Sequence, residues 1–207
     1  MPDFLSLQAF ALVIGLGAIA LIVAYTLITG SPPVPTSHQV WRTFRKLLPR
    51  RLPVLRDSER AVIYELGAGW GGNAFKLADT YPEHRVIGIE RSPLPWLVAR
   101  LRHAIKPRPN LEFRRGNFMT QDLSDAVLLT CYLSSKQMAA LGPKLDAELT
   151  AGALVLSNTF AIPDWRPADS VFADDMDKSP VYLYEAPATP DKGAVADASQ
   201  AASAPDS

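Results

Sequence analysis

The sequence predicts an α/β fold in which a mostly parallel β-sheet carries helices on both faces and is preceded by one N-terminal transmembrane helix. Two observations predict it. From residue 61 to residue 185, short runs rich in β-branched and aromatic residues alternate with stretches of helical periodicity, a pattern typical of βαβ units. Before them, residues 7–29 form an apolar stretch without a charged residue. This stretch is long enough to span a membrane.

The apolar stretch comes first. As a helix, its 23 residues extend over roughly 35 Å, enough to cross a bilayer core. A cleaved signal peptide is the alternative, but it needs a positively charged start, and the only charge before the stretch is Asp3. We expect residues 1–30 to be an uncleaved anchor. Basic residues at positions 42–51 favour the cytoplasmic side for the chain after the anchor, which predicts a single-pass membrane protein with a cytoplasmic domain.

A proline-rich linker, SPPVPTS at residues 31–37, comes after the anchor, because prolines end a helix and keep the chain extended. Residues 39–48 then place apolar side chains on one stripe of a helix and cations elsewhere. This stripe packs on the adjoining domain, as in most surface helices, or the helix lies on anionic lipid beside the anchor with the help of its cations, and the two can hold together.

The strands and helices of the domain alternate in regular order. Strands are expected at residues 61–66, 85–90, 111–115, 125–132, 152–160 and 181–185, with residues 169–173 pairing against the last one as a closing hairpin. Helices are expected at residues 72–80, 93–103 and 135–149. The result is a Rossmann-like sheet, in which ligands bind at the carboxyl ends of the strands.

Composition bounds the domain and its chemistry. Residues 187–207 hold almost no large apolar side chain, so this tail is expected to be disordered, and residues 38–186 remain as one domain. The 21 basic and 21 acidic residues balance, which argues against a nucleic-acid partner. With one cysteine and three scattered histidines, neither a disulfide framework nor a metal site is expected.

A glycine-rich loop after the first strand points to a nucleotide-like cofactor. Gly67, Gly69 and Gly72 satisfy the spacing G-x-G-x-x-G, and Glu90 ends the next strand, where a carboxylate accepts ribose hydroxyls. The spacing alone suits a dinucleotide, but Glu65 would repel a pyrophosphate and attract a cation. After the third strand, an amide and a ring at residues 117–118 suit an adenine. Together they favour S-adenosylmethionine.

These residues carry a resemblance. The segment ELGAGWG, with Glu90 closing the next strand, resembles class I, seven-strand S-adenosylmethionine-dependent methyltransferases. The motifs VPT at residues 34–36, PWLVARLR, LSDAVLL, QMAALGPKLDAEL and FAIPDW are similar to the membrane-anchored lysine N-methyltransferases that act on ATP synthase subunit c and the adenine nucleotide translocase. The resemblance implies a protein-lysine methyltransferase beside a membrane, with a membrane protein as substrate.

The sequence offers candidate residues for each role. The candidates for binding the cofactor are Glu65, Gly67, Ala68, Gly69, Glu90, Arg91, Asn117 and Phe118. Tyr132, after the fourth strand, is the catalytic candidate, because its ring or hydroxyl can line a channel for the amine; a packed aromatic residue at a strand end is the alternative. Thr36, Pro163 and Trp165 are expected to line the substrate channel, although Pro163 and Trp165 also fit a rigid loop.

Two other functions remain open. The anchor would bring a small or lipid-soluble methyl acceptor as readily as a protein, and the same fold can serve as a non-catalytic module that binds S-adenosylmethionine. The partners expected from the sequence are the lipid bilayer and a membrane-protein substrate, without nucleic acid or metal.

Overall fold

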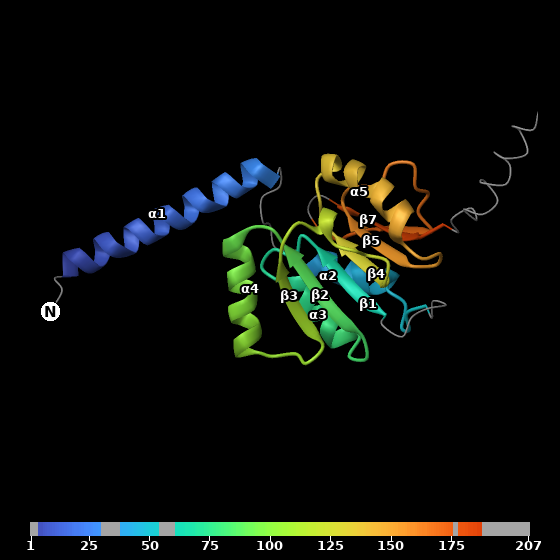
Figure 1. Ribbon diagram of the computed structural model, residues 1–207, viewed down its shortest axis with the longest axis horizontal. Helices are drawn as coiled ribbons and strands as arrows, with labels where there is room; N and C mark the ends of the chain where they lie inside the picture. Colours follow the sequence, from blue (N-terminus) through green and yellow to red (C-terminus); the bar gives the residue numbers. More distant parts are fainter. Residues whose placement is uncertain (1–3, 30–37, 54–60, 176–177, 188–207) are drawn as a thin grey trace, which may run out of the picture.

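The computed structural model describes residues 4–29, 38–53, 61–175 and 178–187, and Figure 1 shows how their elements are arranged. The linker at residues 31–37 and residues 188–207 of the expected tail lie outside the described residues. In chain order, the elements are α1 (Phe4–Thr29), α2 (His38–Leu47), β1 (Val62–Leu66), α3 (Gly72–Thr80), β2 (Arg85–Glu90), α4 (Pro93–Ile105), β3 (Leu111–Arg115), the 3-10 helix η1 (Phe118–Thr120), β4 (Ala126–Cys131), α5 (Ser135–Glu148), β5 (Leu154–Asn158), β6 (Asp169–Phe172) and β7 (Pro180–Glu185).

The strands form one sheet of seven in the order β3-β2-β1-β4-β5-β7-β6. The first five strands of the chain pair in parallel, whereas β7 runs antiparallel to β5 and β6. The mostly parallel sheet and its closing hairpin are thereby confirmed. The strand order reverses between β1 and β4, and at such a switch point the carboxyl ends of the strands leave room for a ligand.

Helices cover both faces of the sheet, as predicted. One buried cluster joins residues of α2, α3 and α4 to one face, and a second joins α5 to the other. The central strands β1 and β4 are buried along their whole length, because helices exclude water from both of their faces. Their sequences are therefore continuous apolar runs rather than alternating ones.

Helix α2 packs against β6 and β7. Its apolar stripe, which includes Val40, Phe44 and Leu47, is buried, and the side chain of Phe44 is only 1% exposed. The cations Arg42 and Arg45 point away from this core and are exposed. The interpretation that this stripe packs on the domain is confirmed, and only the exposed cations of α2 are left to face anionic lipid.

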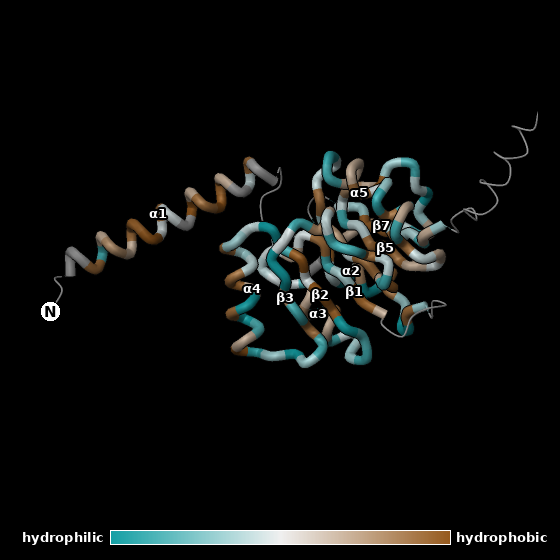
Figure 2. Tube along the Cα trace, in the orientation of Figure 1, coloured by the Kyte–Doolittle hydropathy of each residue, from teal (hydrophilic) through white to brown (hydrophobic). Residues whose placement is uncertain are grey.

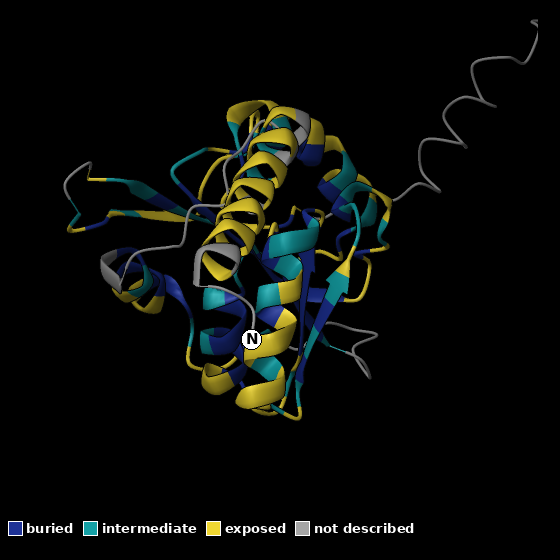
Figure 3. Ribbon diagram, turned by 90° about the vertical axis from the view of Figure 1, so that its left-hand side faces the viewer, coloured by how far each residue is buried: buried dark blue, intermediate teal, exposed yellow. Residues whose placement is uncertain are grey.

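Helix α1 extends away from the domain and is apolar along its length (Figure 2). Its segment Leu7–Ala24 has a mean hydropathy of 2.5 and none of it is buried, so by length and composition it can cross a membrane. Helix α1 also contacts α4. The two helices lie on the same side of the sheet domain (Figures 1 and 3).

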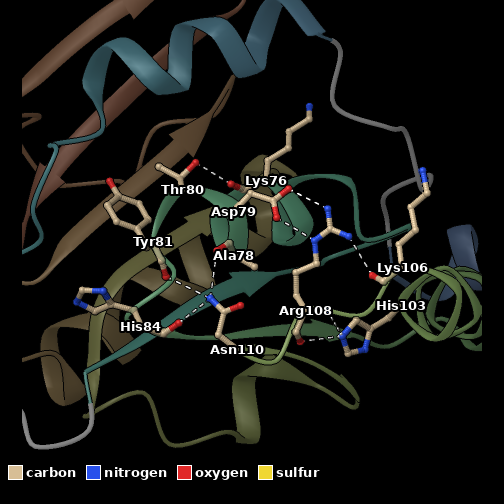
Figure 4. A network of polar contacts seen from close by, with 10 residues as sticks. All are labelled: Lys76, Ala78, Asp79, Thr80, Tyr81, His84, His103, Lys106, Arg108 and Asn110. Carbon is tan, nitrogen blue, oxygen red and sulfur yellow. Dashed lines mark hydrogen bonds and ion pairs between the residues drawn. The ribbon is translucent and has the colours of Figure 1, made fainter.

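A polar network fixes the end of α4 to α3 (Figure 4). The guanidinium group of Arg108 donates to both carboxylate oxygens of Asp79, at 2.8 and 3.0 Å. The side-chain amide of Asn110 donates to three backbone carbonyls, those of Ala78, Tyr81 and His84. These contacts lie just before β3, at the amino ends of the strands and so opposite the carboxyl ends where a ligand would bind. They hold both helices in place.

Strand β5 is shorter than expected, and the backbone explains the difference. The sequence predicts a strand at residues 152–160, but β5 is Leu154–Asn158. Gly152 and Thr159 on either side adopt positive φ angles of 85° and 66°, which a β-strand does not accommodate. After the turn at Thr159, the ring of Phe160 stacks on that of Tyr132, the residue that follows β4.

Candidate active site

The glycine-rich loop between β1 and α3 is fastened to the neighbouring strand. Gly67, Gly69 and Gly71 have φ angles of 72°, 53° and 80°, a region that L side chains rarely adopt. The amides of Gly67 and Ala68 both donate to the carbonyl oxygen of Ile89, each at 2.9 Å. The loop is thereby held at the carboxyl ends of β1 and β2, with Gly67 exposed.

Phe113 of β3 explains two of the glycines. A Cβ atom on Gly71 would lie 2.6 Å from Cζ of Phe113, and one on Gly88 would lie 2.9 Å from Cδ1 of the same ring. The sequence pattern takes Gly72 as the third glycine, but a Cβ there would meet open space. The third position that requires glycine is Gly71, because it combines the left-handed backbone with the close ring.

Glu90 ends β2 with its carboxylate held by the loop. Oε2 accepts a hydrogen bond from the amide of Gly69 at 2.8 Å, and Oε1 accepts one from the amide of Ser92 at 2.6 Å. The residue is 8% exposed. Two backbone donors therefore orient the carboxylate, and its remaining lone pairs can accept the two hydroxyls of a ribose.

Glu65 of β1 is buried beneath the loop at the start of α3. Its carboxylate accepts hydrogen bonds from the amide of Ala74 and the side chain of Asn73, yet burial raises its pKa to about 8. Oε2 is buried without a hydrogen-bond partner among the described residues, and so is Oγ1 of Thr130. Because Glu65 and Thr130 face each other in the β1–β4 register, two buried acceptor oxygens lie at the switch point.

The two buried oxygens of Glu65 and Thr130 match the chemistry of S-adenosylmethionine. Its amino acid end carries an ammonium group, which a buried carboxylate oxygen and a hydroxyl can accept. Its ribose hydroxyls suit the oriented carboxylate of Glu90, and the open side of Gly67 lets a ligand approach the backbone. The residues present therefore fit the cofactor.

The other three residues predicted to bind the cofactor, Arg91, Asn117 and Phe118, differ in how they are placed. Asn117 accepts a hydrogen bond from the amide of Met119 at 3.1 Å, and this fixes its side chain as the cap of η1. The ring of Phe118 is 9% exposed and belongs to the buried cluster beneath α5. Arg91 is exposed. Of the three, Asn117 is placed to offer an amide edge.

Tyr132 and Phe160 form an aromatic pair above the ends of β4 and β5. Their rings are stacked with centroids 6.5 Å apart and an angle of 18° between planes. Tyr132 is 38% exposed, so one face of the pair is open to a ligand. Sequence reasoning misses Phe160 as a site residue, although its position at the end of a predicted strand is a signal that could have found it.

Of the other channel candidates, two lie in the loop after β5 and one lies outside the described residues. Trp165 donates from Nε1 to Asp146 of α5 at 2.9 Å and packs edge-on against Tyr184, with centroids 6.0 Å apart. Pro163 is exposed beside it. Thr36 lies outside the described residues.

Cys131, the residue before Tyr132, is buried among apolar side chains, and burial raises the pKa of its thiol to about 12. A nucleophilic cysteine needs the thiolate, so the site offers no covalent route through this residue.

Comparisons with known proteins identify a family for this chain. The family model described as the ANTKMT methyltransferase domain matches residues 65–169. A protein-lysine N-methyltransferase of Saccharolobus islandicus (strain REY15A) is 29% identical over an alignment of 163 residues that covers 74% of this chain and 92% of the relative.

Solved structures show the same fold. An RNA methyltransferase from Salinibacter ruber, in complex with S-adenosyl-L-homocysteine, aligns with a TM-score of 0.61 and 28% identity over 74% of this chain and 94% of its own. A mutant of MtNAS in complex with S-adenosylmethionine aligns with a TM-score of 0.57 at 13% identity, over 72% and 61% of the two chains. Because the family model matches residues 65–169, which are half of the chain and include both Glu65 and Trp165, the chain belongs to the ANTKMT methyltransferase domain family and is a class I S-adenosylmethionine-dependent methyltransferase.

Proposed function

We propose that this methyltransferase is tethered to a membrane by α1 and transfers methyl groups to lysine amines of membrane proteins on the cytoplasmic side. The observation that supports the proposal most is the similarity to a protein-lysine N-methyltransferase over 74% of the chain. An aligned stretch of that length in a chain of 207 residues includes both the glycine-rich loop and Tyr132.

The chain's own residues would bind and orient the cofactor. When bound, S-adenosylmethionine supplies a methyl group on a positively charged sulfur. Glu90 accepts the ribose hydroxyls, and its two backbone hydrogen bonds prevent the carboxylate from rotating away. Glu65 and Thr130 accept the ammonium group through their buried oxygens, and Asn117 presents its amide to the adenine.

The aromatic pair would hold the acceptor. A lysine amine attacks only when it is neutral, and an apolar surrounding lowers the pKa of an ammonium group. The open face of Tyr132 against Phe160 provides such a surrounding and restricts the direction of approach. Since an in-line displacement at a methyl group depends mainly on alignment, positioning by these two rings is the main contribution asked of the protein.

Helix α1 and the basic face of α2 support the tether and its orientation. Between residues 38 and 60 there are seven basic and two acidic residues, which favours retention on the cytoplasmic side. The exposed cations of α2 stand on the side opposite its buried stripe. A domain held there meets lysines that lie near the membrane surface.

The test uses the full chain in its native membranes with S-adenosylmethionine labelled on the methyl group. We expect label in protein bands and in methyllysine after hydrolysis. The Glu90→Gln variant should lose the label, because Glu90 is proposed to bind the cofactor. The matched control is Glu112→Gln on β3, which should keep the label. Label confined to the organic extract would replace the protein acceptor with a lipid-soluble one, and label confined to RNA would replace it with RNA.

A further inference from the structure

An unpartnered apolar stripe runs along the outer face of α4. Leu97, Leu101 and Ile105 are 46%, 54% and 78% exposed, and their spacing of four residues places them on one side of the helix. Outside α1, the described part of the chain has only two other exposed large apolar side chains, Tyr132 and Phe172. The stripe therefore holds three of the five large apolar side chains outside α1 that are exposed in the described part of the chain.

The opposite face of α4 is fully used by the fold. Pro95 and Ala99 are buried, and Nε1 of Trp96 donates to the carbonyl oxygen of Phe113 at 3.3 Å. The end of the helix is held through the network of Arg108 and Asn110 (Figure 4). Rotating α4 to hide the stripe would break these contacts, so the stripe is a fixed feature of the surface.

The chain segment that carries the stripe has charges of one sign. Residues 91–111 contain five arginines and lysines and no acidic residue. Arg91, Arg100 and Lys106 are exposed, and the side chain of Lys106 extends away from the polar network in Figure 4. An apolar stripe with cations beside it is the pattern of a helix that lies in the interface of an anionic bilayer.

The position of α1 indicates that α4 would face the same bilayer that α1 crosses. Helix α1 contacts α4, and it leaves the domain on the side where α4 lies (Figures 1 and 3). In Figure 1, α4 runs across the direction of α1. If α1 crosses a membrane, α4 is the domain helix that faces it and lies along its surface.

We propose that the stripe of Leu97, Leu101 and Ile105 on α4 docks the methyltransferase domain onto the anionic surface of the membrane that α1 crosses. The proposal rests on the proposed tether. It names α4, rather than α2, as the interfacial helix, because the apolar stripe of α2 is buried in the fold. Docking through α4 also fixes the active site relative to the bilayer. Helix α4 begins directly after Ser92, whose amide donates to the carboxylate of Glu90.

The test places a fluorescent label at one position on α4 of the full chain in lipid nanodiscs. Cys131 is buried, so a thiol-reactive probe reports an introduced cysteine. We compare Leu101→Cys with Lys136→Cys on α5, which covers the other face of the sheet. Lipids that carry a quencher in their acyl chains should quench the label at position 101 about twofold more than the label at position 136, because interfacial helices bury their apolar side by about 5–10 Å.

Lipid composition and the anchor provide the remaining readouts. The excess quenching at position 101 should increase when phosphatidylglycerol replaces part of the phosphatidylcholine, and Arg100→Glu should reverse the increase. Equal quenching at both positions in a chain that resists alkaline extraction would overturn docking alone. Extraction of the chain would overturn the tether and docking together. Disulfide-linked dimers of Leu101→Cys without lipid quenching would assign the stripe to a second copy instead.

Discussion

At the scale of single residues, the protonation of Glu65 has a measurable consequence. Burial raises its pKa from 4.5 to about 8, so between these values the folded protein keeps a proton that the unfolded chain releases. Raising the pH across this window therefore lowers the free energy of unfolding. Glu65→Gln cannot titrate and should show a flatter dependence. Urea unfolding of the full chain in detergent, measured at several pH values, checks this.

The matched control is Glu112→Gln. Hydrogen bonding to Arg114 holds the pKa of Glu112 below its ordinary value, so Glu112 is ionised in both folded and unfolded chains above about pH 5 and contributes no slope there. A slope that survives in Glu65→Gln and disappears in Glu112→Gln would contradict the assignment of the buried proton to Glu65.

The ring of Tyr132, rather than its hydroxyl, is expected to hold the acceptor. Its plane stacks on Phe160, and aromatic contacts of this kind contribute about 0.5–1.5 kcal/mol beyond area burial. Tyr132→Phe should keep most of the activity, whereas Tyr132→Ala should reduce kcat/KM for the acceptor about tenfold. Neither change should alter the Kd for S-adenosylmethionine. Loss of activity in Tyr132→Phe would instead assign the role to the hydroxyl.

At the scale of elements, the sequence predicts the sheet well because its central strands are continuous apolar runs separated by helical patterns. The bounds of β2 and β3 agree with prediction, and those of β5 do not. A left-handed turn at Thr159 has no signal in local composition, since threonine is favoured in strands. For the same reason the sequence places the aromatic partner Phe160 inside the strand rather than over the site.

The loop between β1 and α3 shows the same limit and yields a prediction. Spacing alone cannot separate Gly71 from Gly72; the ring of Phe113 does. Gly71→Ala should lower the free energy of unfolding by about 2–4 kcal/mol, from its left-handed backbone and the clash. Gly72→Ala, in open space at the start of α3, should be neutral or stabilise by less than about 1 kcal/mol. Calorimetric or denaturant unfolding of both variants compares them directly.

At the scale of the whole molecule, the apolar stripe of a helix does not by itself say what the stripe packs against. Both α2 and α4 carry an apolar stripe beside cations. Only the packed structure shows that α2 buries its stripe against β6 and β7 while α4 leaves its own exposed. Which stripe is buried depends on the order of strands in the sheet, and that order arises from contacts distant in sequence. Candidate site residues on β1 and β2 are foreseeable because strand ends converge in any such sheet.

Because α2 lies between α1 and the edge of the sheet, it should unfold together with the domain rather than act as a separate linker. Phe44 is 1% exposed in the cluster that joins α2 to the sheet, and its truncation removes a full aromatic ring from a packed core. Phe44→Ala should therefore lower the free energy of unfolding by about 3–5 kcal/mol, in one transition. Arg45→Ala, at the exposed neighbouring position, should change it by less than about 0.5 kcal/mol. The measurement is urea unfolding followed by tryptophan fluorescence, with Trp70, Trp96 and Trp165 replaced by phenylalanine in every variant so that Trp41 alone reports on α2. If Phe44→Ala shifted only an early, separate transition, α2 would be a detachable segment, and a tether attached through it would leave the active site free to turn away from the membrane.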